Sequence, residues 1–277
     1  MCQSRRVSKL HPMQTSTDMA LAGLAFMAGG FLMIAGLELL LPFRRRTQSP
    51  LTRWTTNLAL FAIDTLAVRF LLPIAMVGTA VFAAQEGWGL SNVLSVPGWL
   101  AFSVTLLVLD LALYLQHWAT HRVPLLWRLH RVHHTDRDFD VTTAARFHPI
   151  EILASMVWKC GIVLALGAPM QAVFVFEVGF ALFTLWTHAN LSLPAGLDRV
   201  ARKLIVTPDM HRIHHSSRER ETNSNYGTVL SGWDKLFGTY RAESQDGQSG
   251  ITIGLVEWQD DRTASLGFSL LLPFRKR

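Results

Sequence analysis

Apolar residues form five long runs along the chain, separated by short polar segments. The runs cover residues 19–41, 57–84, 99–115, 150–167 and 169–187. A helix of about 20 apolar residues crosses the hydrocarbon layer of a bilayer, and the first three runs approach or exceed that length. The last two runs are shorter and meet at Gly167-Ala168-Pro169, which predicts a helical hairpin that dips into or crosses the bilayer. We therefore predict an all-α fold, a polytopic membrane bundle of about four to five helices or hairpins.

Basic residues indicate the orientation of this bundle. Lys and Arg concentrate in residues 43–56, in residues 117–149 and after residue 187, whereas residues 85–98 and 167–170 contain none. By the positive-inside rule, the three basic segments face the cytoplasm, which means the inner membrane if the protein is bacterial. One apolar run contains Asp64 and Arg69, and we expect these two charges to pair locally.

Composition agrees with a membrane protein. The chain is 50% hydrophobic, with a mean hydropathy of +0.25. A net charge of +6 would also fit nucleic-acid binding, but the basic residues flank apolar runs and do not form one stripe, so no nucleic-acid partner is expected. Cys2 and Cys160 provide neither a disulfide framework nor a cysteine zinc motif.

Domain organisation follows from the same pattern. Residues 1–18 form a polar N-terminal tail that we expect to be disordered, and residues from 188 onward are polar enough to fold as a cytoplasmic helical cap. Residues 265–277 are apolar and end in basic residues, which suits either an interfacial anchor or a packed terminal segment. Because no low-complexity linker interrupts the chain, we expect residues 1–277 to form a single integrated membrane domain.

Histidines provide the candidate chemistry. Three short boxes hold eight of the 11 histidines: His117 and His121; His130, His133 and His134; and His211, His214 and His215. Residues three and four apart lie on one face of a helix, so each box can converge on one point. Thr207 as N-cap and Pro208 at the first helical position predict a helix that holds the third box. Any single histidine is more often a satisfied surface or core residue, but eight in three boxes exceed the needs of one ion and predict a two-metal site.

Further polar residues lie near the boxes. His148 and His188 lie at the predicted cytoplasmic edge and suit metal ligands, residues that support a ligand, or helix caps. Asp110 and Tyr114 share a helical face with His117, so Asp110 either orients a ligating imidazole or has only a packing role. The possible ligands or supporting residues are His148, Asp110, Tyr114, Glu151 and Asn190.

The donor set and its position limit the reaction. Nitrogen ligands of borderline softness suit zinc, iron, copper or nickel, and ligand type alone does not choose among them. A site built beneath a membrane bundle suits chemistry on a lipid chain. Unactivated C–H bonds require a redox metal and oxygen, whereas zinc supports hydrolysis or polarisation.

Four motifs resemble those of the fatty acid hydroxylase and sterol desaturase superfamily of membrane di-iron enzymes. They are Asp110-x3-Tyr114-x2-His117-x3-His121, Trp127-Arg-x-His130-x2-His133-His134, Arg146-Phe-His148-Pro149-x-Glu151 and His211-x2-His214-His215, followed by Asn223-Ser-Asn225-Tyr226-Gly227 and a segment from Trp233 to Tyr240. The resemblance covers residues 99–240. It implies that the iron ligands are His117, His121, His130, His133, His134, His188, His211, His214 and His215. Some relatives place a further histidine where this chain has Ser192.

The resemblance also implies a function. Two iron ions would activate O2 to hydroxylate or desaturate a fatty acyl chain, a sterol or a related lipid, and zinc could replace iron during purification. No flavin or nicotinamide fingerprint is present, so a separate electron-donor protein is expected. A histidine-rich transporter or zinc scaffold is the alternative, but a transporter should place its ligands near the bilayer midplane. A haem protein with paired axial histidines would leave the doublets His133-His134 and His214-His215 unexplained.

Overall fold

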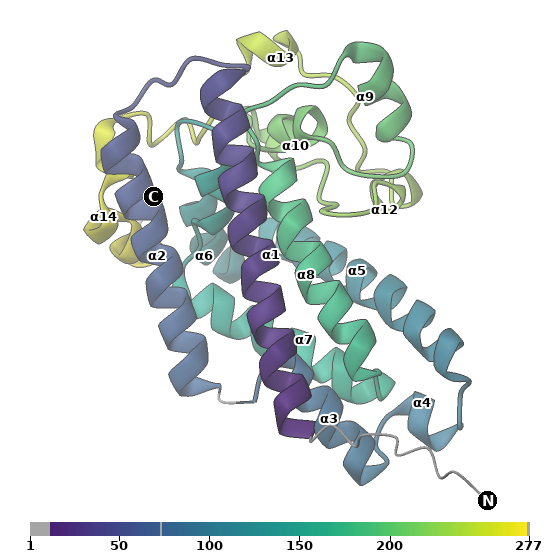
Figure 1. The fold of residues 1–277 in the computed structure, drawn as a ribbon. Helices are drawn as coiled ribbons and strands as arrows, with labels where there is room; N and C mark the ends of the chain where they lie inside the picture. The colour runs from purple at the N-terminus through teal and green to yellow at the C-terminus, as the bar shows by residue number, and fades with distance from the viewer. Residues whose placement is uncertain (1–11, 73, 276–277) are drawn as a thin grey trace, which may run out of the picture.

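The computed structural model describes residues 12–72 and 74–275, and these residues form helices and no β-strand (Figure 1). This confirms the predicted all-α class. The longer helices are α1 (Pro12–Leu40), α2 (Pro50–Leu71), α3 (Met76–Glu86), α5 (Gly98–Arg122), α6 (Pro124–His134), α7 (Pro149–Leu166) and α8 (Met170–Thr187). The shorter α-helices are α4 (Leu90–Val93), α9 (Ala195–Ala201), α10 (Pro208–His214), α11 (Glu219–Thr222), α12 (Gly232–Leu236), α13 (Gly247–Gly250) and α14 (Leu266–Leu271). Three 3-10 helices cover Val141–Ala145, Asp261–Ala264 and Leu272–Phe274.

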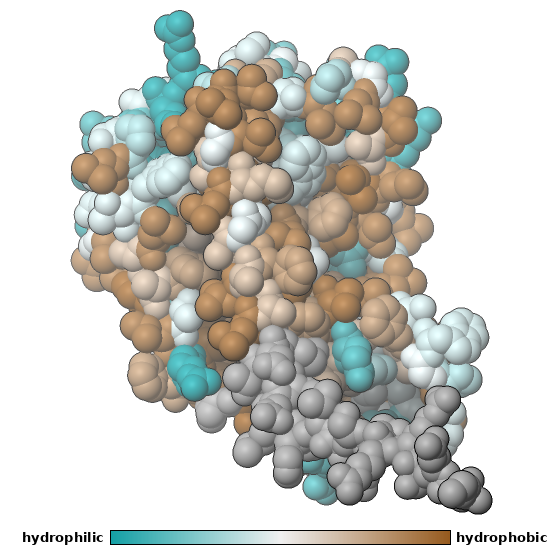
Figure 2. Space-filling view, viewed as in Figure 1, coloured by the Kyte–Doolittle hydropathy of each residue, from teal (hydrophilic) through white to brown (hydrophobic). Residues whose placement is uncertain are grey.

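Five segments are long and apolar enough to cross a membrane: Leu21–Leu40, Pro50–Val93, Gly98–Arg122, Pro149–Leu166 and Met170–Thr187. Helix α8 packs against α1, α3 and α5, and α7 packs against α2, α3 and α5. A core that includes Met76, Leu109, Val163 and Phe176 fills the space between them. Many apolar side chains remain exposed on the bundle, as Figure 2 shows for the face that includes α1 and α2, and this is the surface that lipid covers in a membrane protein.

Three details differ from the sequence-based expectations. The apolar run 57–84 is not one helix, because α2 ends at Leu71 and α3 begins at Met76. Helix α1 begins at Pro12, so residues 12–18 of the expected polar tail are helical, while residues 1–11 lie outside the described residues. The expected Asp64–Arg69 pair is wrong: Asp64 is buried, Arg69 is exposed, and no ion pair joins them among the described residues.

Proline and glycine set the helix boundaries. Pro50 and Pro149 occupy the first turns of α2 and α7, where a missing N–H costs no hydrogen bond. Helix α7 ends at Gly167, whose φ of 61° is left-handed and therefore favours glycine. Gly89 approaches this turn so closely that a Cβ would lie 2.0 Å from the backbone nitrogen of Gly167. The turn between α7 and α8 therefore lies directly against the loop before α4.

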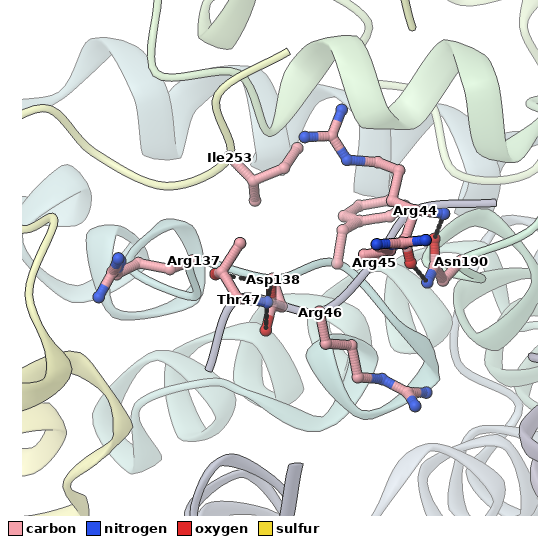
Figure 3. Close-up of a pocket in the computed structure, with 9 residues that line it drawn as sticks. Arg44, Arg45, Arg46, Thr47, Arg137, Asp138, Asn190 and Ile253 are labelled. Atoms are coloured by element: carbon pink, nitrogen blue, oxygen red, sulfur yellow. Dashed lines mark hydrogen bonds between the residues drawn. The ribbon is translucent and has the colours of Figure 1, made fainter. Parts of the chain in front are cut away.

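Helices α9 to α13 and the loops around them form a cap at one end of the bundle (Figure 1). The acidic residue near the end of α1 joins bundle and cap, because Glu38 Oε1 accepts hydrogen bonds from the backbone N–H groups of Val141 and Asn190, both at 2.8 Å. The link between α1 and α2 docks nearby (Figure 3). Asp138 accepts from the Thr47 and Gln48 backbone, and Asn190 bonds both the N–H and the carbonyl of Arg44.

The C-terminal segment packs onto the bundle. Phe268 and Leu272 are buried against Leu60 of α2 and Val132 of α6. Of the two predicted roles for this segment, the structure therefore supports the packed terminal segment. This packing also supports α6, the helix that holds the second histidine box.

Candidate metal centre

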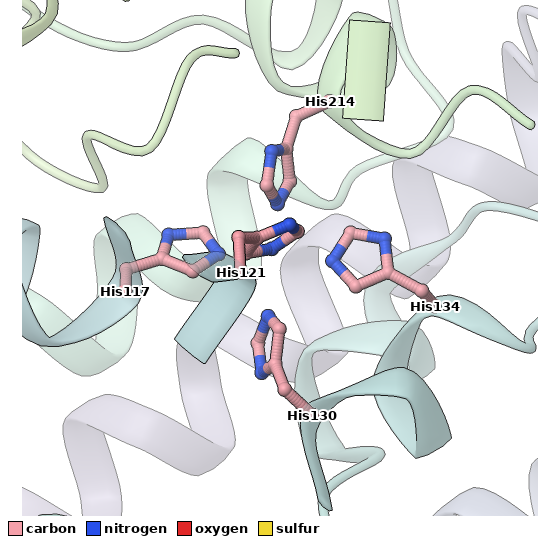
Figure 4. A group of neighbouring side chains, drawn as sticks. All are labelled: His117, His121, His130, His134 and His214. Atoms are coloured by element: carbon pink, nitrogen blue, oxygen red, sulfur yellow. The ribbon is translucent and has the colours of Figure 1, made fainter. Parts of the chain in front are cut away.

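Nine histidines converge in two adjacent groups. The five-histidine group contains His117, His121, His130, His134 and His214 (Figure 4), and the four-histidine group contains His133, His188, His211 and His215. Within each group, one ligand atom from every residue lies within 4.8 Å of the others. These are the nine residues that the sequence singled out as ligands, and the structure brings all of them together.

The boxes do not each form one cluster, which corrects the sequence-based interpretation. His133 and His134 are neighbours in α6, yet they belong to different groups, and so do His214 and His215. Consecutive helical residues point about 100° apart, so a doublet at the end of a helix can face two ions at once. The rings of His130, His133 and His134 lie within 5.3 Å of one another between centroids, so they share one side of α6, and only the expectation that they converge on a single point is wrong.

Local structure explains how the rings reach the centre. His117 and His121 lie one turn apart in the last part of α5. Helix α10 is capped as predicted, because the Thr207 hydroxyl accepts from the Met210 N–H and Pro208 occupies the first turn. His188 ends α8, immediately after the apolar run. The three boxes and His188 thus meet where the bundle joins the cap.

Outer hydrogen bonds fix the orientation of most rings. The Nδ1 atom of His117 lies 2.7 Å from the Tyr226 carbonyl, and that of His214 lies 2.7 Å from the Ser224 carbonyl. His130 Nδ1 lies 2.6 Å from Glu151 Oε1. Since carbonyls and carboxylates accept, each Nδ1 carries the proton and each Nε2 presents a lone pair to the centre. These three Nε2 atoms are buried and have no hydrogen-bond partner among the described residues.

The geometry of the four-histidine group fits a bound cation. His133 Nδ1 donates to the Arg146 carbonyl at 3.2 Å, and His188 Nδ1 donates to the Thr184 carbonyl at 2.8 Å. Their Nε2 atoms, left without protons, nevertheless lie 3.1 Å apart, and His211 Nε2 lies 3.0 Å from His188 Nε2. Facing lone pairs repel one another unless a cation lies between them. The residues present therefore fit a bound metal ion.

Burial keeps these imidazoles neutral, which is the ligating form. Desolvation lowers the pKa of His188 to about 4, although its bond to Thr184 opposes the shift, and lowers the pKa of His214 to about 3. Burial and then neighbouring imidazoles also lower the pKa values of His133, His134, His211 and His215 well below the usual value. At neutral pH these rings can bind a metal ion without first losing a proton.

Aromatic side chains pack against the four-histidine group. Phe147 stacks on His133 with ring centroids 4.4 Å apart, and Phe139 lies 5.1 Å from His215. His134 and His215, one from each group, stack at 4.6 Å, so the two groups share a wall. Nine imidazoles with no carboxylate within either group form a borderline donor set that suits iron, zinc, copper or nickel.

The other predicted site residues have supporting or structural contacts. Glu151 orients His130, as described above. Asp110 accepts from Trp233 Nε1 at 2.8 Å, and the Tyr114 hydroxyl bonds Thr239, so these two residues dock the cap onto α5. Neither forms a hydrogen bond to an imidazole in the part of the chain that the structure describes. Asn190 holds the α1–α2 link.

His148 and Ser192 have structural contacts away from the two groups. His148 caps α7 through Nδ1, and its Nε2 bonds the Leu270 carbonyl, so neither nitrogen faces the histidine groups. Ser192, at the position where some relatives have a histidine, donates to Asp209.

Several supporting residues were not singled out from the sequence as contacts of the histidines. Asp234 accepts from the backbone N–H groups of Tyr226 and Gly227, both at 2.8 Å, and so holds the loop whose carbonyl orients His117. The buried Arg146 side chain bonds the Val132 carbonyl, Asn57 and the Thr263 carbonyl, and so ties α6 to α2 and to the C-terminal segment. Asp234 and Arg146 both lie in the motifs that resemble those of the family, and this is the signal by which the sequence could have indicated a supporting role for them.

Comparisons with known proteins agree with this geometry. The sequence model of the fatty acid hydroxylase family matches residues 102–239, which include all nine histidines. Human alkylglycerol monooxygenase is 29% identical over 63% of this chain and 38% of its own length. The ornithine lipid hydroxylase OlsE of Rhizobium tropici is 33% identical over 56% of this chain and 46% of its own length, and the fatty acid hydroxylase vlmA of Lecanicillium sp is 31% identical over 51% and 42%.

The matched part of the chain thus spans less than half the length of each of these relatives. No solved structure matches significantly. The family match contains the histidines that converge in the structure, in the order that the sequence motifs predicted. The chain belongs to the fatty acid hydroxylase family.

Proposed function

We propose that this protein is a membrane-bound di-iron oxygenase that hydroxylates or desaturates a lipid. The observation that carries the proposal is the convergence of nine buried imidazoles in two adjacent groups at the end of an apolar bundle. A pair of irons supplies, when bound, the oxygen-activating redox chemistry that an unactivated C–H bond requires. Relatives that act on alkylglycerols and ornithine lipids support a lipid substrate.

The stoichiometry of the reaction indicates which other components the enzyme requires. In hydroxylation, the substrate C–H bond breaks and a C–O bond forms. One oxygen atom of O2 enters the alcohol, and the other leaves as water with two protons and two electrons. We infer that a separate electron-donor protein supplies the electrons. We further infer that the histidine groups face the cytoplasm, because basic residues concentrate in the segments on their side of the bundle.

The protein's own residues would perform three tasks. The nine imidazoles would hold two ions. Glu151 and the Tyr226, Ser224, Arg146 and Thr184 carbonyls would orient the rings, which raises their basicity as ligands. Phe139 and Phe147 would exclude water from the four-histidine group.

A metal transporter or zinc scaffold is less well supported. A transport site should lie near the bilayer midplane. Here the ligands come from the last turns of α5, from the end of α8, and from α6 and α10 outside the candidate membrane spans. Buried rings with fixed outer partners suit a resident cofactor better than an ion in transit.

Metal content and product formation test the proposal together. Protein purified in detergent and loaded with iron should contain two ions per chain. It should also convert an alkylglycerol or an ornithine lipid in the presence of O2 and a reductant, with one atom of ¹⁸O2 in the product. His133→Ala and His214→Ala should abolish conversion, whereas His148→Ala should keep both ions, because His148 lies in neither group. One ion per chain, or lipid conversion that survives both substitutions, would refute a di-iron oxygenase.

A further inference from the structure

We propose that an acidic electron-carrier protein docks on the surface above Phe139 and delivers electrons there to the four-histidine group. The inference rests on the proposed function and names the partner that this function requires. We call the docking site the arginine surface. It consists of Arg44, Arg45 and Arg46 on the α1–α2 link and of Arg137, which follows α6, and Figure 3 shows these side chains around a small depression. The α1–α2 link lies at the end of the bundle that bears the cap, where a soluble protein can reach it (Figure 1).

Phe139 connects the depression with the four-histidine group. It lines the depression and is only 4% exposed. Its ring centroid lies 5.7 Å from that of His188, 6.3 Å from that of His211 and 5.1 Å from that of His215. A protein that covers the depression would therefore contact the side chain that packs on three of the four histidines. Because the rate of electron transfer falls steeply with distance, this short packed path favours electron delivery at the arginine surface.

The depression is too small for a diffusible organic cofactor. Its volume is about 20 Å³, which is enough for about one water molecule. A flavin or nicotinamide ring would not fit inside it. The electron carrier would therefore remain outside, as a protein with its own redox group does when it docks. Complexes between electron-transfer proteins are small, burying less than about 1,200 Å², so a shallow surface is sufficient.

Two arginines of the surface have charges that no carboxylate neutralises directly. The Arg44 guanidinium donates to the backbone carbonyls of Gln248 and Ser249, and these neutral acceptors leave its charge in place. Arg45 is exposed to solvent. Within residues 12–72 and 74–275, no ion pair joins Arg44 or Arg45 to a carboxylate. Both charges are therefore available to attract an anionic partner.

The other charges around the depression are paired or buried. Arg46 lies 3.6 Å from the buried Glu38, and Arg137 lies 3.1 Å from the exposed Asp261. Asp138, the acidic residue in the wall, is 6% exposed and accepts hydrogen bonds from two backbone N–H groups of the α1–α2 link. The exposed part of the surface is therefore positive. It is complementary to a carrier that has carboxylates around its redox group.

The cavity at the end of α5 is less suitable for such a carrier. Its wall contains Glu219 and Glu257 together with Arg131, so two carboxylates would face an acidic protein there. His121 is the histidine in this wall, and both of its ring nitrogens are buried. Like charges across an interface oppose association. The difference in charge favours the arginine surface as the place where electrons are delivered.

Reduction by an acidic carrier tests the inference. Iron-loaded protein in phosphatidylcholine nanodiscs would be mixed in a stopped-flow instrument with reduced plant-type ferredoxin, which is an acidic one-electron carrier. The second-order rate constant should fall as ionic strength rises, because salt screens the attraction between opposite charges. Ferredoxin whose carboxylates have been converted to amides should react about tenfold more slowly. No reduction by native ferredoxin, or equal rates for the native and amidated carriers, would overturn the inference.

Charge reversal locates the docking site. Arg45→Glu with Arg137→Glu should slow reduction by ferredoxin about tenfold. It should also weaken binding of oxidised ferredoxin to the oxidised protein in surface plasmon resonance, where no electron is transferred. Arg45→Lys with Arg137→Lys keeps both charges and should keep the rate. Arg199→Glu is the matched control, since Arg199 is an exposed arginine of α9 outside the depression, and its rate should equal that of the parent protein.

A small reductant separates this inference from the proposed function. Reduced methyl viologen is a cation that needs no docking surface, so it should reduce the charge-reversed variant at least as fast as the parent protein. If viologen supports no lipid oxidation by the parent protein, the proposed function fails. If it does, but ferredoxin reduces the charge-reversed variant at the parental rate, only the docking surface fails.

Two further outcomes would also refute the docking surface. Equal slowing of the charge-reversed variant with viologen and with ferredoxin would place the defect in the metal centre. A loss that appears in phosphatidylglycerol nanodiscs and not in phosphatidylcholine nanodiscs would mean that the arginines bind anionic lipid.

Discussion

The five-histidine group and the four-histidine group use the same ligand type but differ in their surroundings. The four-histidine group is fully buried and faces Phe139 and Phe147. In the five-histidine group, His117 and His121 are only partly buried, and His121 lines a cavity. We infer that the four-histidine group holds its ion in a closed environment, whereas the five-histidine group is less well shielded from solvent. In this interpretation, the fifth imidazole of the five-histidine group strengthens metal binding and so compensates for the weaker shielding of that group from water.

Removal of one ligand from each group should have the largest effect, and it should reveal the difference between the two groups in metal retention. His211→Ala leaves three imidazoles in its group, and we expect loss of that ion and of more than about 100-fold in activity, beyond the upper figure for losing an outer partner. His121→Ala leaves four imidazoles, so its ion should be retained with reduced affinity. The number of iron ions per chain, measured by mass spectrometry, distinguishes the two variants. Equal metal loss in both variants would mean that ligand number does not set affinity here.

Replacement of Glu151, the carboxylate partner of His130, should give the next largest effect. Glu151→Gln keeps an acceptor for His130 Nδ1 but removes its charge, and outer-partner losses of this kind cost about 10-fold to 100-fold in metal affinity. Competition with a chelator should show weaker binding of one ion only. Asp110→Asn is the matched control, because Asp110 is also buried but bonds Trp233 and no imidazole. Comparable weakening in the control would assign the effect to general destabilisation.

A smaller effect is expected at Asp234. In Asp234→Asn one acceptor oxygen becomes an amide NH2, which would face the N–H of Tyr226 or Gly227. The loop should loosen at a cost of about 1–3 kcal/mol in unfolding free energy, and His117 should lose part of its orientation. Thermal unfolding in detergent measures the first change, and metal affinity of the five-histidine group measures the second. Asp234→Glu should restore part of the affinity.

The pH dependence of the metal-free protein gives the smallest effect near neutrality. Buried His188 and His214 have pKa values of about 4 and about 3 in the folded protein, below the 6.5 of an exposed imidazole. As pH falls below 6.5 the unfolded chain takes up protons that the folded chain does not, so stability falls until the pH approaches the folded pKa values. The melting temperature should be flat above pH 7 and decrease from pH 6.5 toward pH 4. A melting temperature that is constant over this range would contradict neutral, buried rings.

The sequence predicted the elements of the bundle and the ligand residues better than their grouping. Apolar runs and Pro or Gly boundaries located α7 and α8 almost to the residue, because local chemistry determines where such helices end. The break between α2 and α3 was missed, since both sides of it are apolar and hydropathy does not change. The partition of His133 and His134 depends on how α6, α8 and α10 pack, and spacing along one helix contains no information on that packing.

Supporting contacts were the least predictable part of the site. Asp110 shares a helical face with His117, and the sequence pattern therefore suggested an orienting role, but the structure pairs it with Trp233 from the cap. The residue that does orient His117 is a backbone carbonyl, and any residue type provides one. Glu151 reaches His130 from a different helix. Contacts of this kind come from tertiary packing, which one sequence does not reveal.

The two histidine doublets have a consequence for the distance between the two histidine groups. Neighbouring Cα atoms across a trans peptide are 3.8 Å apart, and His133-His134 and His214-His215 each place one ring in each group across such a link. Two short covalent links therefore join the two groups, and they would limit how far apart two bound ions can lie. Sequence changes elsewhere in the protein could then alter the substrate without separating the two histidine groups.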